Sequence, residues 1–229
     1  MNSLSRRVVG VVTALAAALL IALAVSRLLA AVTVLPSSPT LNRLQSLEPV
    51  ETSDLQRLVR NQRRALVWQA AGRTWTDLGL AQLLLAERLG DADPRSQQRF
   101  SLARQALFEG LSVAPANPFA WSRLAYAEAV ISGWSERASK ALRMAFIAGP
   151  YEPRLLWPRL RLALAAWPHV EASDQEMILQ QLREAWAADP EALAALVAQQ
   201  GQVDLARTAL SGSPADLRAF ETLAAGRRP

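Results

Sequence analysis

The chain has 229 residues, of which 51% are hydrophobic and 20% charged, and this composition excludes an intrinsically disordered chain. It contains no cysteine and one histidine, which excludes disulfide frameworks, thiolate chemistry and multi-histidine metal sites. The net charge of +5 arises near the N-terminus: residues 1–73 carry nine arginines against three acidic residues, whereas residues 74–229 carry 16 basic and 17 acidic ones. Nucleic-acid-binding domains concentrate basic residues on their folded module, so no nucleic-acid partner is expected.

The first element in chain order is an apolar segment long enough to cross a membrane. Residues Val8–Ser26 are 19 consecutive positions without a charged side chain, and Arg6 and Arg7 precede them. A helix of this length spans about 28 Å, close to the ~30 Å thickness of the hydrocarbon core. Arg27 then falls at the far interface, where its long side chain can carry the charge to water. We expect residues 1–35 to form a single-pass membrane anchor.

A cleaved signal peptide is the alternative interpretation, because small residues suited to cleavage occur between Ala22 and Ser26. The apolar core of a signal peptide is usually ~7–15 residues long, so the greater length here favours an uncleaved anchor. Arg6 and Arg7 favour a cytoplasmic N-terminus, although Arg27 and Arg43 nearly balance them on the other side. The expected location is the inner (cytoplasmic) membrane, with the rest of the chain in the periplasm.

Small residues recur every four positions along the apolar segment, which places them on one stripe of a helix. They are Gly10, Ala14, Ala18, Ala22 and Ser26. Stripes of this kind let two membrane helices approach closely, so they predict a helix–helix contact within the bilayer. The alternative is an alanine-rich anchor in which small residues also fall elsewhere.

Residues 36–72 are expected to form a linker followed by a basic amphipathic helix. Three prolines and several hydroxyl residues predict a largely extended spacer over 36–52. A helix capped by Thr52 or Ser53 then begins near Asp54. Its apolar face comprises Leu55, Leu58, Val59, Leu66 and Ala70, and its remaining surface carries Arg57, Arg60, Arg63 and Arg64. Such a helix either touches anionic headgroups or glycans, or packs on the next domain with a solvated arginine face, and the second reading is favoured because charge runs are usually solvated.

The remainder of the chain repeats. Three segments share their spacing: Ala103, Leu107, Gly110 and Pro115; then, 35 residues later, Ala138, Leu142, Ala145 and Pro150; then, after a further 40 residues, Ile178, Leu182, Ala185 and Pro190. The segments that accompany them begin Trp75-Thr-Asp-Leu78-Gly79, Trp121-Ser-Arg-Leu124-Ala125 and Trp157-Pro-Arg-Leu160. Loops are predicted to absorb the additional residues around 90–98 and 165–173. Strand-like alternation is absent from the sequence outside the apolar segment, so the fold is predicted to be all-α.

This pattern resembles the tetratricopeptide repeat, a helix–turn–helix unit of ~34 residues with a W-x2-L-G…A-x3-F…P signature. The resemblance covers residues 73–211 and implies a short right-handed α-solenoid of three to four TPR-like hairpins. A degenerate fourth pair follows Pro190, and residues 212–229 are expected to form a C-terminal capping helix and tail. The spacings of 35 and 40 residues depart from the family value, and in the third unit Leu156, one residue before Trp157, has the same spacing from its proline as Trp121 has.

In the resembling family, bound peptides contact first-helix positions that flank the Trp and Leu of the signature. Carried onto this chain, the resemblance implies a partner-binding groove formed by Phe119, Ser122, Tyr126, Val130, Arg154 and Arg161. The aromatic residues would supply contact area and the arginines would bind a carboxylate or phosphate. The alternative is that Phe119 and Tyr126 belong to the core and that the arginines are solvated.

The sequence shows no pattern typical of a catalytic, metal or cofactor site. His169 has no cysteine partner, no nucleophile-elbow motif accompanies it, and the glycines do not cluster into a phosphate-binding loop. The leading interpretation is a non-enzymatic scaffold that binds other proteins in a cell-envelope complex concerned with secretion, polysaccharide export or membrane-enzyme assembly, without a small-molecule substrate. The alternatives are an accessory subunit held through its transmembrane helix, and a glycan-modifying or hydrolytic enzyme that depends on His169.

Overall fold

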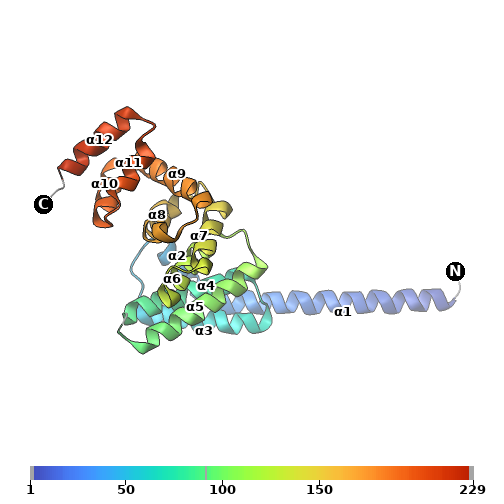
Figure 1. Cartoon of the computed structure of the whole chain (residues 1–229). Helices are drawn as coiled ribbons and strands as arrows, with labels where there is room; N and C mark the ends of the chain where they lie inside the picture. The colour runs from blue at the N-terminus through green and yellow to red at the C-terminus, as the bar shows by residue number, and fades with distance from the viewer. Residues whose placement is uncertain (1–2, 91, 227–229) are drawn as a thin grey trace. The chain divides into compact units, whose positions relative to one another are not determined.

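In the computed structural model, which describes residues 3–90 and 92–226 and side chains from residue 10 onward, every regular element of the described residues is a helix (Figure 1). This confirms the all-α prediction. The chain divides into two compact units, Met1–Val113 and Ala114–Pro229. The side chains of Arg6 and Arg7, on which the predicted orientation depends, lie outside the described residues.

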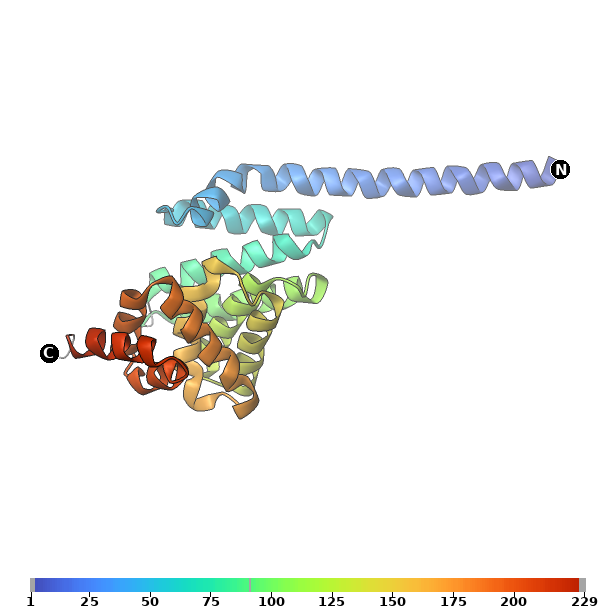
Figure 2. The same ribbon diagram turned by 90° about the horizontal axis from the view of Figure 1, so that it is seen from above.

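The first unit begins with a long apolar helix and ends with a closely packed helix pair. Its elements are α1 (Ser3–Val34), the 3₁₀ turn η1 (Leu35–Ser37), α2 (Ser38–Gln45), α3 (Thr52–Trp68), α4 (Gly72–Leu89) and α5 (Pro94–Val113). Helix α3 packs against both α1 and α4, and α4 packs against α5 (Figure 2).

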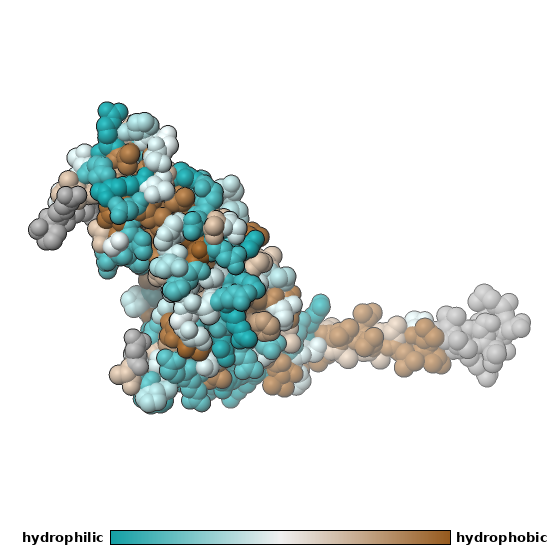
Figure 3. Space-filling view, in the orientation of Figure 1, coloured by the Kyte–Doolittle hydropathy of each residue, from teal (hydrophilic) through white to brown (hydrophobic). Residues whose placement is uncertain are grey.

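The first part of α1 is an uncovered apolar rod. Every described side chain from Gly10 to Val25 is exposed, and the large apolar ones retain 47–66% of their accessible surface. Figure 3 shows this apolar surface bare along the part of the helix that projects from the unit. The helix continues without a break through Arg27, and by length and composition it is suited to cross a membrane. Exposure falls only from Ser26 onward, where α1 packs on α3 and Ala30 is buried.

The prediction of a largely extended spacer over residues 36–52 is wrong for its first part. Residues 35–45 are helical, as η1 and α2, and only the segment after Gln45 is irregular. Pro36 and Pro39 each stand in the first turn of their element, where the N–H that proline lacks would have no helical partner and its fixed φ suits the helix. Thr40 and Leu41 are buried, so this arm packs against its own unit.

Helix α3 presents its apolar face to the core of the first unit. Leu55, Leu58 and Val59 are buried, Leu66 is half-buried, and Ala70 lies beyond the end of the helix and is exposed. The four arginines of α3 are all outside the core: Arg57, Arg60, Arg63 and Arg64 are exposed. The prediction of a Thr52 or Ser53 cap is wrong, since Glu51 holds that position and no side-chain hydrogen bond closes the helix start.

The loop predicted over residues 90–98 is shorter than expected, because residues 94–98 are helical. Helix α5 begins at Pro94, and the Asp93 Oδ1 accepts the Arg95 backbone N–H at 2.9 Å just before it. The wide interval between Trp75 and Trp121 instead reflects long helices, since α4 has 18 residues and α5 has 20.

The second unit is a succession of short helices. They are α6 (Pro118–Ser132), α7 (Glu136–Ala148), η2 (Pro153–Leu155), α8 (Leu156–Ala166), η3 (Trp167–His169), α9 (Ala172–Ala188), α10 (Pro190–Gln199), α11 (Val203–Leu210) and α12 (Pro214–Ala225). Each of the pairs α6–α7, α8–α9 and α10–α11 packs together, and α9 also contacts α11.

The recurring aliphatic and small-residue positions are core positions in both units, whereas the repeated tryptophans are half-buried and the repeated prolines are exposed. Leu78, Leu124 and Leu160 are all buried, and so are the repeated residues of the companion helices, which are Ala103, Leu107 and Gly110 on α5, Ala138, Leu142 and Ala145 on α7, and Ile178, Leu182 and Ala185 on α9. The period seen in the sequence is therefore a period of packing contacts between successive helices.

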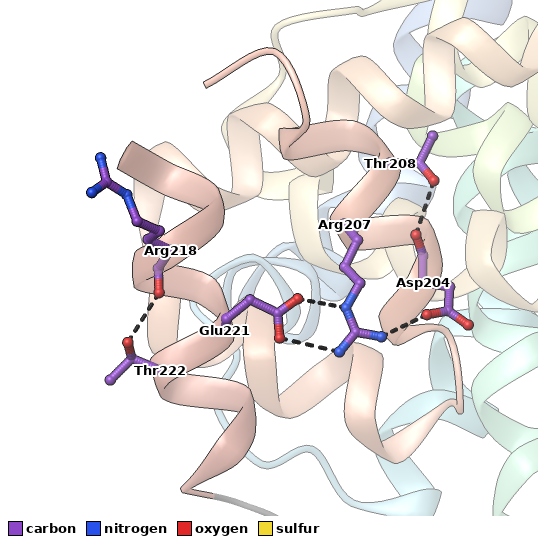
Figure 4. Close-up of polar contacts among 6 residues, drawn as sticks. All are labelled: Asp204, Arg207, Thr208, Arg218, Glu221 and Thr222. Carbon is purple, nitrogen blue, oxygen red and sulfur yellow. Dashed lines mark hydrogen bonds and ion pairs between the residues drawn. The ribbon is translucent and has the colours of Figure 1, made fainter. Parts of the chain in front are cut away.

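Helix α12 is held to α11 by a charged contact. The Arg207 guanidinium donates from Nε to Glu221 Oε1 at 2.6 Å and from a terminal nitrogen to Oε2 at 3.1 Å, while its other terminal nitrogen reaches Asp204 at 2.6 Å (Figure 4). Hydrogen bonds to Glu221 and then to Asp204 hold the pKa of Arg207 above its ordinary value. On the same helix, Phe220 is fully buried, and its ring centroid lies 6.0 Å from that of Trp186 in an edge-on arrangement.

Candidate partner-binding surface

Helix α6 carries four of the six groove residues predicted from the sequence. Its start is fixed by Asn117, whose Oδ1 accepts the Ala120 N–H at 3.1 Å, and by Pro118 in the first turn. The predicted residues follow at intervals of three or four along the helix, so they occupy one stripe: Phe119, Ser122, Tyr126 and Val130.

The members of this stripe differ in accessibility. Phe119, Tyr126 and Val130 are half-buried, whereas Ser122 is only 5% exposed and offers almost no surface to a partner. The Arg123 guanidinium lies 5.9 Å from the centroid of the Phe119 ring, which adds a cation to the aromatic surface. The usable part of the stripe is therefore apolar and aromatic, with one arginine beside it.

Arg154 and Arg161, the two predicted anion-binding residues, are exposed on consecutive elements. Arg154 lies in η2, where its backbone N–H donates to Glu152 Oε1 at 3.2 Å, and Arg161 lies on α8. Helix α8 contacts α6, so the two parts of the predicted groove belong to neighbouring elements of one unit.

Arg159, which the sequence did not mark as a site residue, is the arginine of this region that is enclosed by hydrogen-bond partners. Arg159 lies between the two predicted arginines and is fully buried. Its guanidinium donates to the carbonyl oxygens of Ala145, Gly149 and Pro150 at 2.7–3.0 Å, and its Nε donates to Gln181 Oε1 at 2.7 Å. Ala145 lies in the last turn of α7, where carbonyl groups have no partners within the helix, and Gly149 and Pro150 follow the end of that helix.

Two further features complete the Arg159 site. The guanidinium carbon lies 4.7 Å above the Phe146 ring, in cation–π geometry. Burial lowers the pKa of Arg159, and the nearby carboxylates of Glu184 and Glu152 act in the opposite direction. Arg159 therefore joins α7, α8 and α9 in the core and is not available to a partner. From sequence alone, an arginine beside a core leucine is expected to be solvated. The sequence around Arg159 therefore contains no pattern that indicates this structural role.

Two hollows in the second unit were not expected from the sequence. One, of about 860 Å³, lies between α9, α11 and the start of α12, and its wall includes Arg183, Trp186 and Asp216. The other, of about 400 Å³, lies between the end of α7 and α9, and its wall includes Ile147, Tyr151 and acidic Glu176 and Glu184. Tyr151 is 82% exposed and Ile147 is 55% exposed, so the second hollow presents apolar surface beside carboxylates.

The small-residue stripe of α1 is uncovered in the structure. Gly10, Ala14, Ala18 and Ala22 are exposed, and a Cβ added to Gly10 would meet no atom of the described side chains within 4 Å. Ser26 is half-buried, and its hydroxyl donates to the Leu23 carbonyl of its own helix at 2.9 Å. This side of α1 is therefore open to another helix.

The one histidine and the one lysine, two side chains suited to acid–base chemistry, lie on different elements. His169 is exposed at the end of η3, and Lys140 pairs with Glu136 at 2.5 Å on the surface of α7. That hydrogen bond raises the pKa of Lys140, which keeps the amine protonated and is the opposite of what a general base requires. Within residues 3–90 and 92–226, no group of three or more histidine, aspartate or glutamate side chains is placed to hold a metal ion.

Comparison of the chain with protein-family models gives no match, and comparison with curated proteins gives none either.

Proposed function

We propose that this protein is a membrane-anchored adaptor whose helical repeats, of the tetratricopeptide kind, bind another protein of the cell envelope. The observation that carries the proposal is the combination of a bare apolar helix with successive helix pairs whose repeated leucine and small-residue positions are buried. In this view the pairs form a short right-handed solenoid of three to four hairpins. Units of this type bury a continuous core by stacking, and the concave surface that results binds extended peptides.

The anchor determines where the adaptor acts. With α1 spanning the inner membrane and its short N-terminal tail in the cytoplasm, the helix pairs lie in the periplasm beside the bilayer. The partner is then an integral or peripheral envelope protein, and no cofactor or small-molecule substrate is required. Secretion, polysaccharide export and membrane-enzyme assembly are the processes that such an adaptor would serve.

The proposed contact surface is the aromatic stripe of α6 together with the exposed arginines of η2 and α8. Phe119 and Tyr126 supply rigid apolar area, and Arg154 and Arg161 supply cations for an acidic side chain or a chain terminus. Arg123, which lies over the Phe119 ring, adds a third cation to the same surface.

The test is site-specific crosslinking of the full-length protein in intact membranes. A photoreactive residue in place of Tyr126 should capture one specific partner, whereas the same residue in place of exposed Glu191, on α10, should not. The double change Arg154→Glu and Arg161→Glu should abolish the Tyr126 adduct while leaving the protein in the membrane. Equal capture at both positions, or an adduct that is indifferent to the charge reversal, would contradict this surface.

A second candidate function, an accessory subunit held through its membrane helix, is favoured by one observation. The small-residue side of α1 is uncovered, which suits close packing against another membrane helix. Replacing Ala14 and Ala18 by leucine should then release the protein from its complex, with crosslinking from Tyr126 reduced only as a consequence. Retention of the complex in that variant would argue for the adaptor surface.

A further inference from the structure

One end of the first unit gathers exposed apolar and aromatic side chains. Val67 and Trp68, the last two residues of α3, are 81% and 49% exposed. Phe108 and Val113, in the last turns of α5, are 63% and 56% exposed. Exposed large apolar residues are costly in water unless something covers them, so their position within the unit is informative.

The packing of the unit brings these residues to one end. The Asn61 side chain of α3 donates to Ser37 Oγ, just after α1, at 3.0 Å, and α3 then runs back along the last part of α1. A Cβ added to Gly110 of α5 would lie 3.0 Å from the carbonyl oxygen of Gly72, the first residue of α4. The end of α5 therefore lies beside the α3–α4 turn, and both lie on the side from which α1 projects (Figures 1 and 2).

The hydrogen bond between Asn61 and Ser37 fixes the register of α3 along α1, and so the position of this end of the unit along the α1 axis. Trp68 is seven residues past Asn61, and Ala30 is seven residues before Ser37, so Trp68 lies roughly level with Ala30 at ~1.5 Å per residue. That level is about 5 Å beyond Arg27, where the uncharged segment of α1 ends. The headgroup layer of a bilayer is ~5–8 Å thick on each side of the hydrocarbon core. If α1 spans the membrane, Trp68 is at headgroup height.

The charges around this end match a lipid surface. Arg60, Arg63 and Arg64 lie in the last turns of α3 and are exposed, and the side chain of Arg73, at the start of α4, is 79% exposed. Tryptophan beside arginine is the combination that favours the membrane–water interface, because the ring prefers the headgroup region and the guanidinium binds lipid phosphates. Helix α3 cannot lie flat on the bilayer, however, since its apolar face is buried inside the unit. Only its C-terminal end is free to make the contact.

We propose that the end of the first unit formed by Val67 and Trp68, with Arg63 and Arg64 behind them, inserts into the headgroup layer of the membrane that α1 spans. We call these four residues the α3 tip. The contact would hold α3 upright on the bilayer and fix the orientation of the first unit on the membrane surface. The inference rests on the anchor of the proposed function, and it adds a second point of attachment to the same bilayer.

The experiment exploits the absence of cysteine from the chain. Single-cysteine variants Val67→Cys and Leu47→Cys of the full-length protein are labelled with an environment-sensitive fluorophore and reconstituted into phosphatidylcholine vesicles with phosphatidylglycerol. The lipids carry nitroxide quenchers either at shallow depth or deep in the acyl chains. Leu47 is the matched control, because it is 92% exposed and lies between α2 and α3, at the opposite end of α3. A third variant, Ala18→Cys, reports on the span itself.

The expected result is loss of about half or more of the Val67 fluorescence with the shallow quencher, because a label within the ~5–8 Å headgroup layer lies at the depth of that nitroxide, and no loss at Leu47. The Arg63→Gln and Arg64→Gln double variant should reduce the quenching at Val67, and so should omission of phosphatidylglycerol. If the Ala18 label is quenched by the deep nitroxide while the Val67 label is not, the α3 tip proposal is overturned and the anchor stands. If the Ala18 label is not quenched, the anchor itself fails. Disulfide-linked dimers of Val67→Cys in place of quenching would assign the tip to a second copy and likewise overturn the proposal.

Discussion

Gly79 of α4 lies against Leu107 of α5 so closely that a Cβ at position 79 would be 2.6 Å from Leu107 Cγ. The same Cβ would lie 3.3 Å from the Ala103 carbonyl oxygen, so backbone as well as side chain limits the space. Both residues belong to the repeating pattern, in which a small residue follows Leu78 on one helix and a leucine recurs on the other. The small residue of the pattern is therefore what lets α4 and α5 approach each other.

Gly79→Ala should lower the stability of the first unit. Alanine gains ~1 kcal/mol in helix propensity, but forcing a methyl group into a filled interface usually costs about 1–3 kcal/mol, so the net effect is destabilising. The measurement is the denaturation midpoint of the full-length protein in detergent micelles, followed by helical circular dichroism.

A double-mutant cycle identifies the contact responsible. In the background of Leu107→Ala, which removes the crowded atoms, Gly79→Ala should cost clearly less than in the wild type. Gly212→Ala is the control for adding a methyl group, since a Cβ there would meet nothing within 4 Å. An unchanged midpoint for Gly79→Ala would mean that α4 and α5 can move apart without loss of stability. The glycine would then not determine the distance between the two helices.

Arg159→Met should destabilise the second unit by about 3 kcal/mol or more, because it leaves buried carbonyl oxygens and the Gln181 amide without their donor. Arg161→Met, two residues away on the exposed surface, should change stability by less than ~0.5 kcal/mol. Hydrogen exchange should show the loss of protection at the end of α7, where the Arg159 guanidinium binds the chain. Equal effects of the two substitutions would refute the structural role assigned to Arg159.

The contrast between these two arginines shows what sequence reasoning can and cannot supply. Helical periodicity and the repeated Leu, Ala and Gly positions predict which residues are buried, because burial of apolar side chains follows directly from the period of the helix. The burial of Arg159 depends on the last turn of α7 and on the path of the chain just after it, which together turn three carbonyl oxygens toward one point. Contacts of this kind join segments that are distant in sequence, and no local pattern records them.

Packing between elements also explains why the spacer before α3 was predicted wrongly and why the exposed residues at its end were not predicted. Prolines suggested extended chain over residues 36–52, yet Pro36 and Pro39 occupy first turns, the helical position where proline is tolerated. Composition alone does not distinguish the two uses of proline. The α3 tip was likewise invisible in the sequence, because Val67 and Trp68 become notable only when α3 is packed back along α1.

Gln62 of α3 should be replaceable by a nonpolar residue with a gain in stability. It is fully buried, and among the residues that the structure describes neither its Nε2 nor its Oε1 has a hydrogen-bond partner. Leaving a buried amide unpaired costs about 1–3 kcal/mol, so Gln62→Met should raise the denaturation midpoint.

Gln82 of α4 is the matched control for Gln62. It is 2% exposed, but its Oε1 accepts from Arg99 at 2.9 Å. Gln82→Met should therefore lower the midpoint by leaving the guanidinium without this acceptor. The two substitutions are chemically identical, so opposite signs would establish that hydrogen-bond satisfaction, and not side-chain volume, decides the outcome. A loss of stability in Gln62→Met would show that the amide is paired in solution.

Asp216 should make the attachment of α12 sensitive to acid. Hydrogen bonds from Ser213 and then from the Trp186 side chain hold the pKa of the Asp216 carboxyl below its ordinary value of 3.8. A carboxyl whose pKa is lower in the folded state contributes stability above its unfolded pKa, and that contribution is lost as the pH falls through the folded pKa. The contribution is therefore complete at neutral pH and disappears progressively below about pH 4.

The measurement compares wild type with Asp216→Asn between neutral pH and the acid range, using hydrogen exchange of α12 corrected for the intrinsic rate. At neutral pH the amides of α12 should exchange faster in the variant than in the wild type. This difference in exchange rate should become smaller below about pH 4, because the wild-type carboxyl is then neutral as well. Trp186→Phe retains the aromatic packing on Phe220 but lacks the indole N–H, so it should reduce the same acid-sensitive difference. A constant difference across the whole pH range would mean that Asp216 acts through packing, with no contribution from its charge.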